Sequence, residues 1–295
     1  MYDKPFCHFS KLTLYFAKQI KYNRLIQFLE IKKEVLKMKK VLAILLAVIA
    51  VAFSFAACSK TESSDFAEIQ EKGKLVVGIT DYAPMDYKEE GSDEWTGFDA
   101  ELAQAVADKL GLEVEFLEIE WDNKFLELKT KGIDCIWNGM TITDEVKLNT
   151  TVTNAYARNR QVVVMNKDKA AQYTTVESLK DLTFAVENGS SGQGAAEENG
   201  LQATAVAAQS DTLLEVKSGS VDAAIIDSVM ADAMTGEGTD YADLAVAVVL
   251  SEEQFGIGCR QGSDLAEKID AALAELKADG TMQKLSEKYG VELMD

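Results

Sequence analysis

The chain has 295 residues, with 30 Lys and Arg against 49 Asp and Glu and a formal net charge of −19. Residues 58–295 alone contain 20 Lys and Arg against 46 Asp and Glu, and so acidic a segment excludes nucleic acid and anionic lipid headgroups as direct partners. The only histidine is His8, so residues 58–295 have no His-dependent catalysis and no His-ligated metal, although they are long enough to bury one large core or two smaller ones.

Residues 38–57 have the pattern of a secretory signal peptide. Two lysines precede an apolar run at residues 41–55, and small residues follow it. The run is too short for a comfortable membrane-spanning helix. Residues 55–58 (FAAC) resemble the lipobox of bacterial lipoproteins, although phenylalanine stands where that motif prefers leucine. We therefore expect Cys58 to be lipidated and the protein to be lipid-anchored to the outer side of the cell membrane, and an uncleaved N-terminal anchor is the alternative.

Residues 1–37 precede the methionine at which such a signal peptide would start. Lys33-Glu34-Val35 can be encoded as AAG GAG GT followed by any base, which contains a bacterial ribosome-binding sequence at a suitable distance from the Met38 codon. We expect translation to begin at Met38 and residues 1–37 to be a misassigned upstream segment. Detection of these residues in the cellular protein by mass spectrometry would contradict this.

After a short polar tether at residues 58–65, strand-like and helix-like segments alternate, which is typical of an α/β fold. In chain order the pattern predicts a strand at 75–79, a helix at 98–110, a strand at 114–119, a helix at 123–131, strands at 133–137, 162–165, 183–186, 223–226 and 244–249, and helices at 265–278 and 281–289. Gly111 is expected to end the first long helix, and Ser263 and Gly280 to begin and end the helix at 265–278. Cys135 and Cys259 fall in apolar strand-like runs, which favours buried free thiols over a disulfide.

Six segments resemble, in family order, the solute-binding proteins (family 3) that serve polar amino acid ABC importers. They are GFDAELAQAVADKL (97–110), GIDCIWNGMTIT (132–143), NAYARNRQVVV (154–164), FAVENGSSG (184–192), SVDAAIIDS (220–228) and the long final segment at 255–290. The resemblance implies a two-lobed, type II periplasmic-binding-protein-like α/β fold. Two crossover strands, near 161–164 and 251–256, would form the hinge. Lobe 1 would comprise residues 66–159 and 251–295, and lobe 2 residues 160–250, with the ligand in the cleft between them.

The resemblance also implies which side chains face the side chain of the ligand. Tyr82 and Trp121 match the family's two aromatic positions, where a ring supplies apolar area and about 0.5–2 kcal/mol of cation–π energy for a cationic ligand. Ordinary core packing is the alternative for both rings. Asp81 matches an acidic position that faces the distal amine in relatives that prefer basic amino acids.

A second implied set contacts the polar groups of the ligand. Asn138, Gly139 and Thr141 match the loop that binds the α-amino and carboxylate groups. Ser190 and Ser191 match the residues of lobe 2 that bind the carboxylate, and a turn that begins a helix is the alternative for them.

Asp227 matches the carboxylate that pairs with the α-ammonium group, and a buried aspartate needs such a partner. The main departure is Val146, because the family places there an arginine that binds the α-carboxylate, and valine cannot donate a hydrogen bond. Either Arg158 or Arg160 takes over, or the ligand lacks a carboxylate. Since Asp227, Ser190 and Ser191 still match the family's ligand-binding positions, we expect the ligand to be an amino acid or close derivative, with an amine or cationic solute as the alternative.

The expected function is therefore capture of a small solute by a monomer and its delivery to an ABC permease and its ATPase, with no cofactor, no metal and no enzyme activity. A dehydratase-type enzyme on the same scaffold is one alternative, for which Glu187 is the only candidate acid or base. A sensor domain is another. Turnover of cyclohexadienyl substrates would identify the enzyme.

Overall fold

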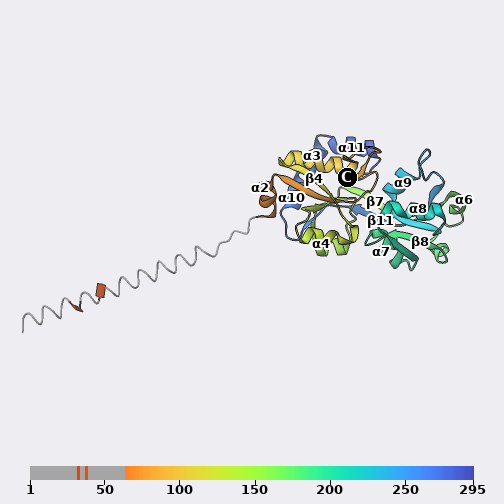
Figure 1. Cartoon of the computed structure of the whole chain (residues 1–295), viewed down its shortest axis with the longest axis horizontal. Helices are drawn as coiled ribbons and strands as arrows, with labels where there is room; N and C mark the ends of the chain where they lie inside the picture. The colour runs from red at the N-terminus through yellow and green to blue at the C-terminus, as the bar shows by residue number, and fades with distance from the viewer. Residues whose placement is uncertain (1–31, 34–36, 39–63) are drawn as a thin grey trace, which may run out of the picture. The chain divides into compact units, whose positions relative to one another are not determined.

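The computed structural model describes residues 32–33, 37–38 and 64–295. The predicted signal peptide after Met38, Cys58 and the tether up to residue 63 lie outside these residues. The chain divides into two units, residues 1–63 and 64–295, and the sheets of the fold belong to the second (Figure 1). No helix in the described part is both long and apolar enough to cross a membrane.

The first of two five-stranded sheets has the strand order β4-β1-β5-β12-β6. β1 is parallel to β4 and β5, whereas β12 is antiparallel to β5 and β6. Its strands are β1 (Lys74–Ile79), β4 (Glu113–Glu118), β5 (Cys135–Ile136), β6 (Thr150–Val152) and β12 (Gly258–Arg260). The accompanying elements are α2 (Asp65–Lys72), β2 (Tyr87–Lys88), β3 (Trp95–Thr96), α3 (Phe98–Leu110), η1 (Trp121–Asn123), α4 (Lys124–Lys129), α5 (Asp144–Asn149), α10 (Leu265–Ala278) and α11 (Thr281–Tyr289).

The second sheet has the order β11-β7-β10-β8-β9. Its strands are β7 (Ala157–Asn166), β8 (Thr183–Glu187), β9 (Gln202–Val206), β10 (Ala223–Asp227) and β11 (Leu244–Phe255). The accompanying helices are α6 (Lys167–Ala170), η2 (Val176–Leu179), α7 (Ser191–Glu198), α8 (Gln209–Ser218) and α9 (Ser228–Met234). Along β10 the side chains alternate between two apolar clusters, so this sheet is buried on both faces.

The antiparallel strands β7 and β11 join the two sheets (Figure 1). They pair from Ala157 opposite Phe255 to Asn166 opposite Leu244. Only residues 161–165 of β7 also pair with β10, so residues 157–160 and 252–255 form a two-stranded ribbon between the lobes. The outgoing ribbon segment therefore lies about four residues before the predicted crossover at 161–164, whereas the returning one overlaps the predicted 251–256.

The three longest apolar helical patterns have the predicted bounds, namely α3, α10 and α11. α3 ends at Gly111 with φ 71°, as predicted. One end assignment was wrong. Asp264, not Ser263, is the N-cap of α10, although the Ser263 Oγ accepts a hydrogen bond from the Leu265 N–H at 3.1 Å. α10 ends at Ala278 with Asp279 as its C-cap, and Gly280, with φ 84°, follows as predicted and is also the N-cap of α11.

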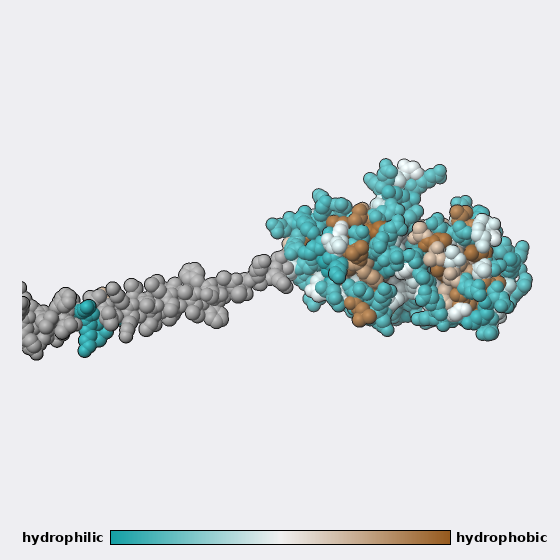
Figure 2. Space-filling view, turned by 60° about the horizontal axis from the view of Figure 1, so that its bottom comes forward, coloured by the Kyte–Doolittle hydropathy of each residue, from teal (hydrophilic) through white to brown (hydrophobic). Residues whose placement is uncertain are grey.

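Cys135 and Cys259 lie opposite each other on β5 and β12 as buried free thiols, which confirms that prediction. Hydrophilic residues cover most of the face shown in Figure 2, in line with the acidic composition.

Candidate ligand-binding cleft

A cavity of about 1030 Å³ lies between the two lobes and against the β7–β11 ribbon. Its lining comes from the segments after β1 and β5, from the ends of β8 and β10, from the start of α7, and from both ribbon strands. Eight acidic and four basic side chains are in the lining. The volume suits a ligand of the size of an amino acid.

Eight of the nine predicted ligand-binding residues line this cavity: Tyr82, Trp121, Asn138, Gly139, Thr141, Ser190, Ser191 and Asp227. Asp81 does not, and its exposed side chain has Glu118 and Lys88 as its charged neighbours. The structure thus brings the eight together from both lobes, and the role of each in binding stays a prediction.

Asp227 ends the buried strand β10, and only 6% of its surface is exposed. Its Oδ1 accepts hydrogen bonds from Asn159 Nδ2 and, at 2.6 Å, from Gln161 Nε2, and its Oδ2 accepts one from Gln209 Nε2 at 2.9 Å. Burial, followed by the charge of Glu253, raises the pKa of Asp227 to about 6, against the opposing effect of the amide donors. Its donors are all neutral, so the carboxylate is solvated by the protein but not neutralised.

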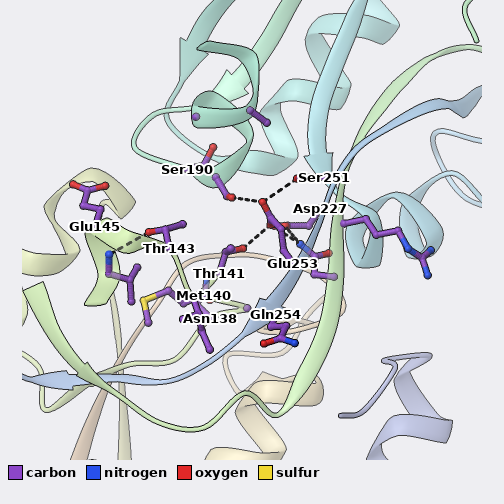
Figure 3. A pocket seen from close by; sticks show the side chains of 18 of the residues that line it. Asn138, Met140, Thr141, Thr143, Glu145, Ser190, Asp227, Ser251, Glu253 and Gln254 are labelled. Atoms are coloured by element: carbon purple, nitrogen blue, oxygen red, sulfur yellow. Dashed lines mark hydrogen bonds between the residues drawn. The ribbon is translucent and has the colours of Figure 1, made fainter. Parts of the chain in front are cut away.

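Glu253, on the ribbon strand β11, is a site residue that sequence reasoning missed. Its Oε2 accepts hydrogen bonds from Thr141 Oγ1 at 2.8 Å and Gln161 Nε2 at 3.0 Å. Its Oε1 accepts from Ser191 Oγ at 2.6 Å and Ser251 Oγ at 3.2 Å (Figure 3). The Thr141 and Ser191 hydroxyls, one from each lobe, therefore meet on a carboxylate of the chain itself.

Lys124 is a second residue that the sequence did not indicate. It starts α4, is only 5% exposed, and its Nζ donates to the carbonyl oxygens of Gly189 at 2.9 Å and Trp121 at 3.2 Å. The ammonium also lies 4.7 Å from the centroid of the Trp121 ring. Because α4 belongs to lobe 1 and Gly189 to lobe 2, this hydrogen bond joins the two lobes. Burial lowers the pKa of Lys124, against the charges of Glu145 and Glu187.

Glycine is required at two points of the lining. Gly189 has φ 70°, and a Cβ there would lie 2.8 Å from Asp122 Oδ1 across the cleft. Gly139 has φ 57°, and a Cβ there would lie 2.7 Å from the ring of Tyr82. These glycines allow close approach of the two lobes and packing of the aromatic ring, respectively.

The predicted loop at 138–141 is held mainly by its own lobe. Asn138 Oδ1 accepts from the Thr80 N–H at 2.9 Å, and its Nδ2 donates to Thr80 Oγ1 at 2.7 Å. The Gly139 N–H donates to Asp99 Oδ2 at 2.6 Å. Burial raises the pKa of Asp99 to about 7, although this N–H and the Tyr156 hydroxyl favour its charged form. Thr141 is thus the residue of this loop whose side chain reaches across to the ribbon.

Both arginines proposed to replace the family's carboxylate ligand line the cavity, and each pairs there with Glu292, which lines it too. Arg158 pairs with Glu292 at 3.4 Å and Asp295 at 3.2 Å, and Arg160 pairs with Glu292 at 3.6 Å. Val146 is buried in an apolar cluster with Trp121.

Glu187, at the end of β8, is buried, and burial with the nearby charge of Asp227 raises its pKa to about 8. No ion pair in the described part of the chain includes Glu187, Asp227 or Glu253. Residues 32–33, 37–38 and 64–295 also contain no cluster of three or more side chains suited to hold a metal ion.

Residues 75–292 match the family described as bacterial extracellular solute-binding proteins, family 3. The chain belongs to this family. The arginine-binding extracellular protein ArtP of Bacillus subtilis (strain 168) is 33% identical over 258 residues, which cover 85% of this chain and 98% of that protein. The match confirms the predicted family, whose curated relatives are extracellular or periplasmic amino-acid-binding proteins.

Solved structures confirm the predicted fold. An ABC uptake transporter substrate-binding protein from Streptococcus pneumoniae with bound histidine has a TM-score of 0.71 and 32% identity, over 78% of this chain and 97% of that one. The ancestral amino acid-binding protein AncCDT-1, described as a precursor of cyclohexadienyl dehydratase, has a TM-score of 0.69 and 33% identity, over 75% of this chain and 97% of that one.

Proposed function

We propose that this protein captures a small solute, an amino acid or related amine, between its two lobes outside the cell membrane and delivers it to an ABC permease and its ATPase. The observation that carries the proposal is the buried carboxylate of Asp227, which faces a cavity shared by both lobes and has only neutral donors around it. A buried carboxylate in this position favours a cationic nitrogen of a ligand as its partner.

Ligand binding would favour closure of the lobes, with residues 66–159 and 251–295 as lobe 1 and residues 160–250 as lobe 2. The β7–β11 ribbon is the only double connection between the sheets in the described part, so it would serve as the hinge. A ligand that contacts both lobes at once stabilises the closed form by its differential affinity for it. Tyr82 and Trp121 would flank the ligand, and the loop at 138–141 would bind it together with Ser190 and Ser191.

For the anchor, we propose that residues 38–57 are removed, that Cys58 carries the lipid, and that residues 58–65 form the tether. A single acyl chain gives only marginal attachment, so stable anchoring would take more than one chain. Lipidation would be visible as an added mass on the peptide that begins at Cys58.

One observation favours an enzyme as a second candidate. Glu187 lines the cavity with a pKa near 8, which suits a general acid or base, and the similar structure AncCDT-1 is described as a precursor of a dehydratase. Turnover of cyclohexadienyl substrates that is lost in Glu187→Gln would support this candidate over simple binding.

The proposed function is tested by a thermal-shift screen of the purified protein against amino acids and amines, followed by calorimetry of each compound that stabilises it. A ligand at a hundredfold excess over its Kd adds about 2.7 kcal/mol to the unfolding free energy. Stabilisation that disappears in Asp227→Ala is the expected result. The proposal is wrong if no compound of either class stabilises the protein.

A further inference from the structure

The inference concerns the chemical class of the ligand and rests on the proposed function, binding of a small nitrogenous solute in this cleft. We infer that the ligand is an amine or guanidine without a free carboxylate, because Glu253 already fills the donors that a ligand carboxylate would need. The chain thus supplies, from its own hinge strand, the anion that amino acid ligands carry themselves.

The first step is the saturation of Glu253. It accepts hydrogen bonds from the hydroxyls of Thr141, Ser191 and Ser251 and from two side-chain amides. A carboxylate offers about four lone-pair sites, so its accepting capacity is used. Each hydroxyl has a single proton, and the protons of Thr141 and Ser191 both point to Glu253. A ligand carboxylate placed at these hydroxyls would find no proton there and would lie beside a like charge.

The second step is the small number of other donors for an anion in the described cleft, among which the Ser190 hydroxyl accepts a hydrogen bond from the Gln193 N–H at 3.1 Å and keeps its own proton. Val146 offers no donor, and the exposed guanidinium groups of Arg158 and Arg160, although they line the cavity, pair with carboxylates near the C-terminus. Lys124 is the one buried base of the described lining, and two of its three protons go to the carbonyl oxygens of Gly189 and Trp121. Its remaining donor is the strongest rival site for a ligand carboxylate.

The third step is the excess of acceptors. The Tyr82 hydroxyl and the Gln161 Oε1 are buried without a hydrogen-bond partner, and both side chains are at least 98% buried. Buried polar atoms are rarely left unpaired, so the Tyr82 hydroxyl, which lines the cavity close to Asp227 and can donate or accept, points to a bound polar group, whereas Gln161 lies outside the cavity lining. Asp227 adds negative charge that no ion pair of the described residues offsets, and Glu187, whose pKa is about 8, adds a second charge only at higher pH. An ammonium or guanidinium group donates several hydrogen bonds and carries the opposite charge, so it matches this lining.

The test uses pairs of compounds that differ only by the carboxylate: agmatine against arginine, cadaverine against lysine, and histamine against histidine. Their Kd values are measured by calorimetry on the purified full-length protein at about pH 8, where Asp227, with a pKa of about 6, is ionised. We expect at least one amine to bind about tenfold or more tightly than its amino acid. Tighter binding of the amino acid in every pair that binds would overturn the inference and leave the proposed function intact. Absence of binding by all six compounds would overturn the inference, whereas the proposed function fails only if the wider thermal-shift screen also finds no ligand.

A variant separates the role of Glu253 from a general effect on the cleft. Glu253→Ala frees the hydroxyls of Thr141 and Ser191, so arginine should bind about tenfold more tightly and agmatine about tenfold more weakly than to the wild type. Opposite shifts for the two members of a pair cannot come from partial unfolding. Glu253→Gln keeps the shape of the side chain and removes its charge, so it too should tighten arginine binding and weaken agmatine binding. Glu71→Ala, which removes an exposed charge on α2 outside the cavity, is the control and should shift neither. Equal shifts for both ligands in Glu253→Ala would contradict the inference.

Discussion

Replacement of Asp227 by asparagine should make the stability of the free protein less sensitive to pH and should weaken ligand binding. The structure gives the reason, since this carboxylate is buried, has neutral donors only and has Glu253 as a charged neighbour. Other groups close to it are Glu187 on β8 and the Tyr82 hydroxyl after β1. Asparagine keeps the shape of the side chain and removes the charge.

The magnitude follows from the two pKa values. The pKa of Asp227 is about 6 in the folded protein and 3.8 as its ordinary value, so the folded state binds the proton more tightly than the unfolded state. The associated stability is complete below about pH 4 and is lost as the pH rises through about 6, and the whole loss is about 3 kcal/mol. About half of that loss, roughly 1.4 kcal/mol, falls between pH 5 and pH 8.

The assay is urea unfolding of the wild type and Asp227→Asn at both pH values without ligand. The stability of the wild type should fall by about 1.4 kcal/mol more between pH 5 and pH 8 than that of the variant. Binding of a cationic ligand should weaken about a hundredfold in the variant, because a buried charge partner is lost. Asp232→Asn, an exposed change on α9, is the matched control and should behave like the wild type. Equal pH dependence of the wild type and Asp227→Asn would refute the reasoning.

Three further substitutions test the cleft. Val146→Arg restores a donor for carboxylates, so calorimetry should show about tenfold tighter arginine binding, and unchanged affinity would contradict this. Lys124→Met removes the hydrogen bond to the Gly189 carbonyl that joins the lobes, which contributes about 0.5–1.5 kcal/mol. Ligand dissociation measured by stopped flow should therefore be about threefold to tenfold faster. An unchanged rate would show that this hydrogen bond is not part of closure. Gly189→Ala places a Cβ against Asp122, so affinity should fall about tenfold or more, whereas wild-type affinity would show that the lobes bind ligand without this close approach.

The long helices could be predicted because their signal is local. In α10 five apolar residues recur at helical spacing, and all of them are buried: Leu265, Ile269, Ala272, Leu273 and Leu276. β5 has only two residues, Cys135 and Ile136, and lies between β1 and β12. Its extent is decided by pairing with distant strands, which composition alone does not report. The predicted strand at 133–137 was therefore too long.

Most of the candidate site came from the family resemblance, and the two residues that it missed depend on the folded arrangement. Glu252 and Glu253 are adjacent and chemically identical, so the sequence cannot say which one accepts from the hydroxyls of Thr141 and Ser191. On β11 the alternation of side chains and a register irregularity between Val249 and Ser251 decide it. Glu253 is then half-buried among hydroxyls and amides, and Glu252 is exposed. From the sequence, Lys124 is expected to be a surface lysine at the start of a helix. Only the folded structure shows that the opposite lobe places the Gly189 carbonyl against its ammonium group.

The placement of Glu253 also changes what a ligand has to do. In an amino acid complex the ligand carboxylate can connect donors of the two lobes, and here Glu253 connects Thr141 of lobe 1 with Ser191 of lobe 2 without any ligand. The cost of bringing the lobes together is then the negative charge of Asp227 beside Glu253, since like charges repel strongly in a poorly hydrated cleft. A cation relieves that repulsion only when it is bound between the lobes. The positive charge of the ligand, rather than its carboxylate, would therefore couple binding to closure in this protein.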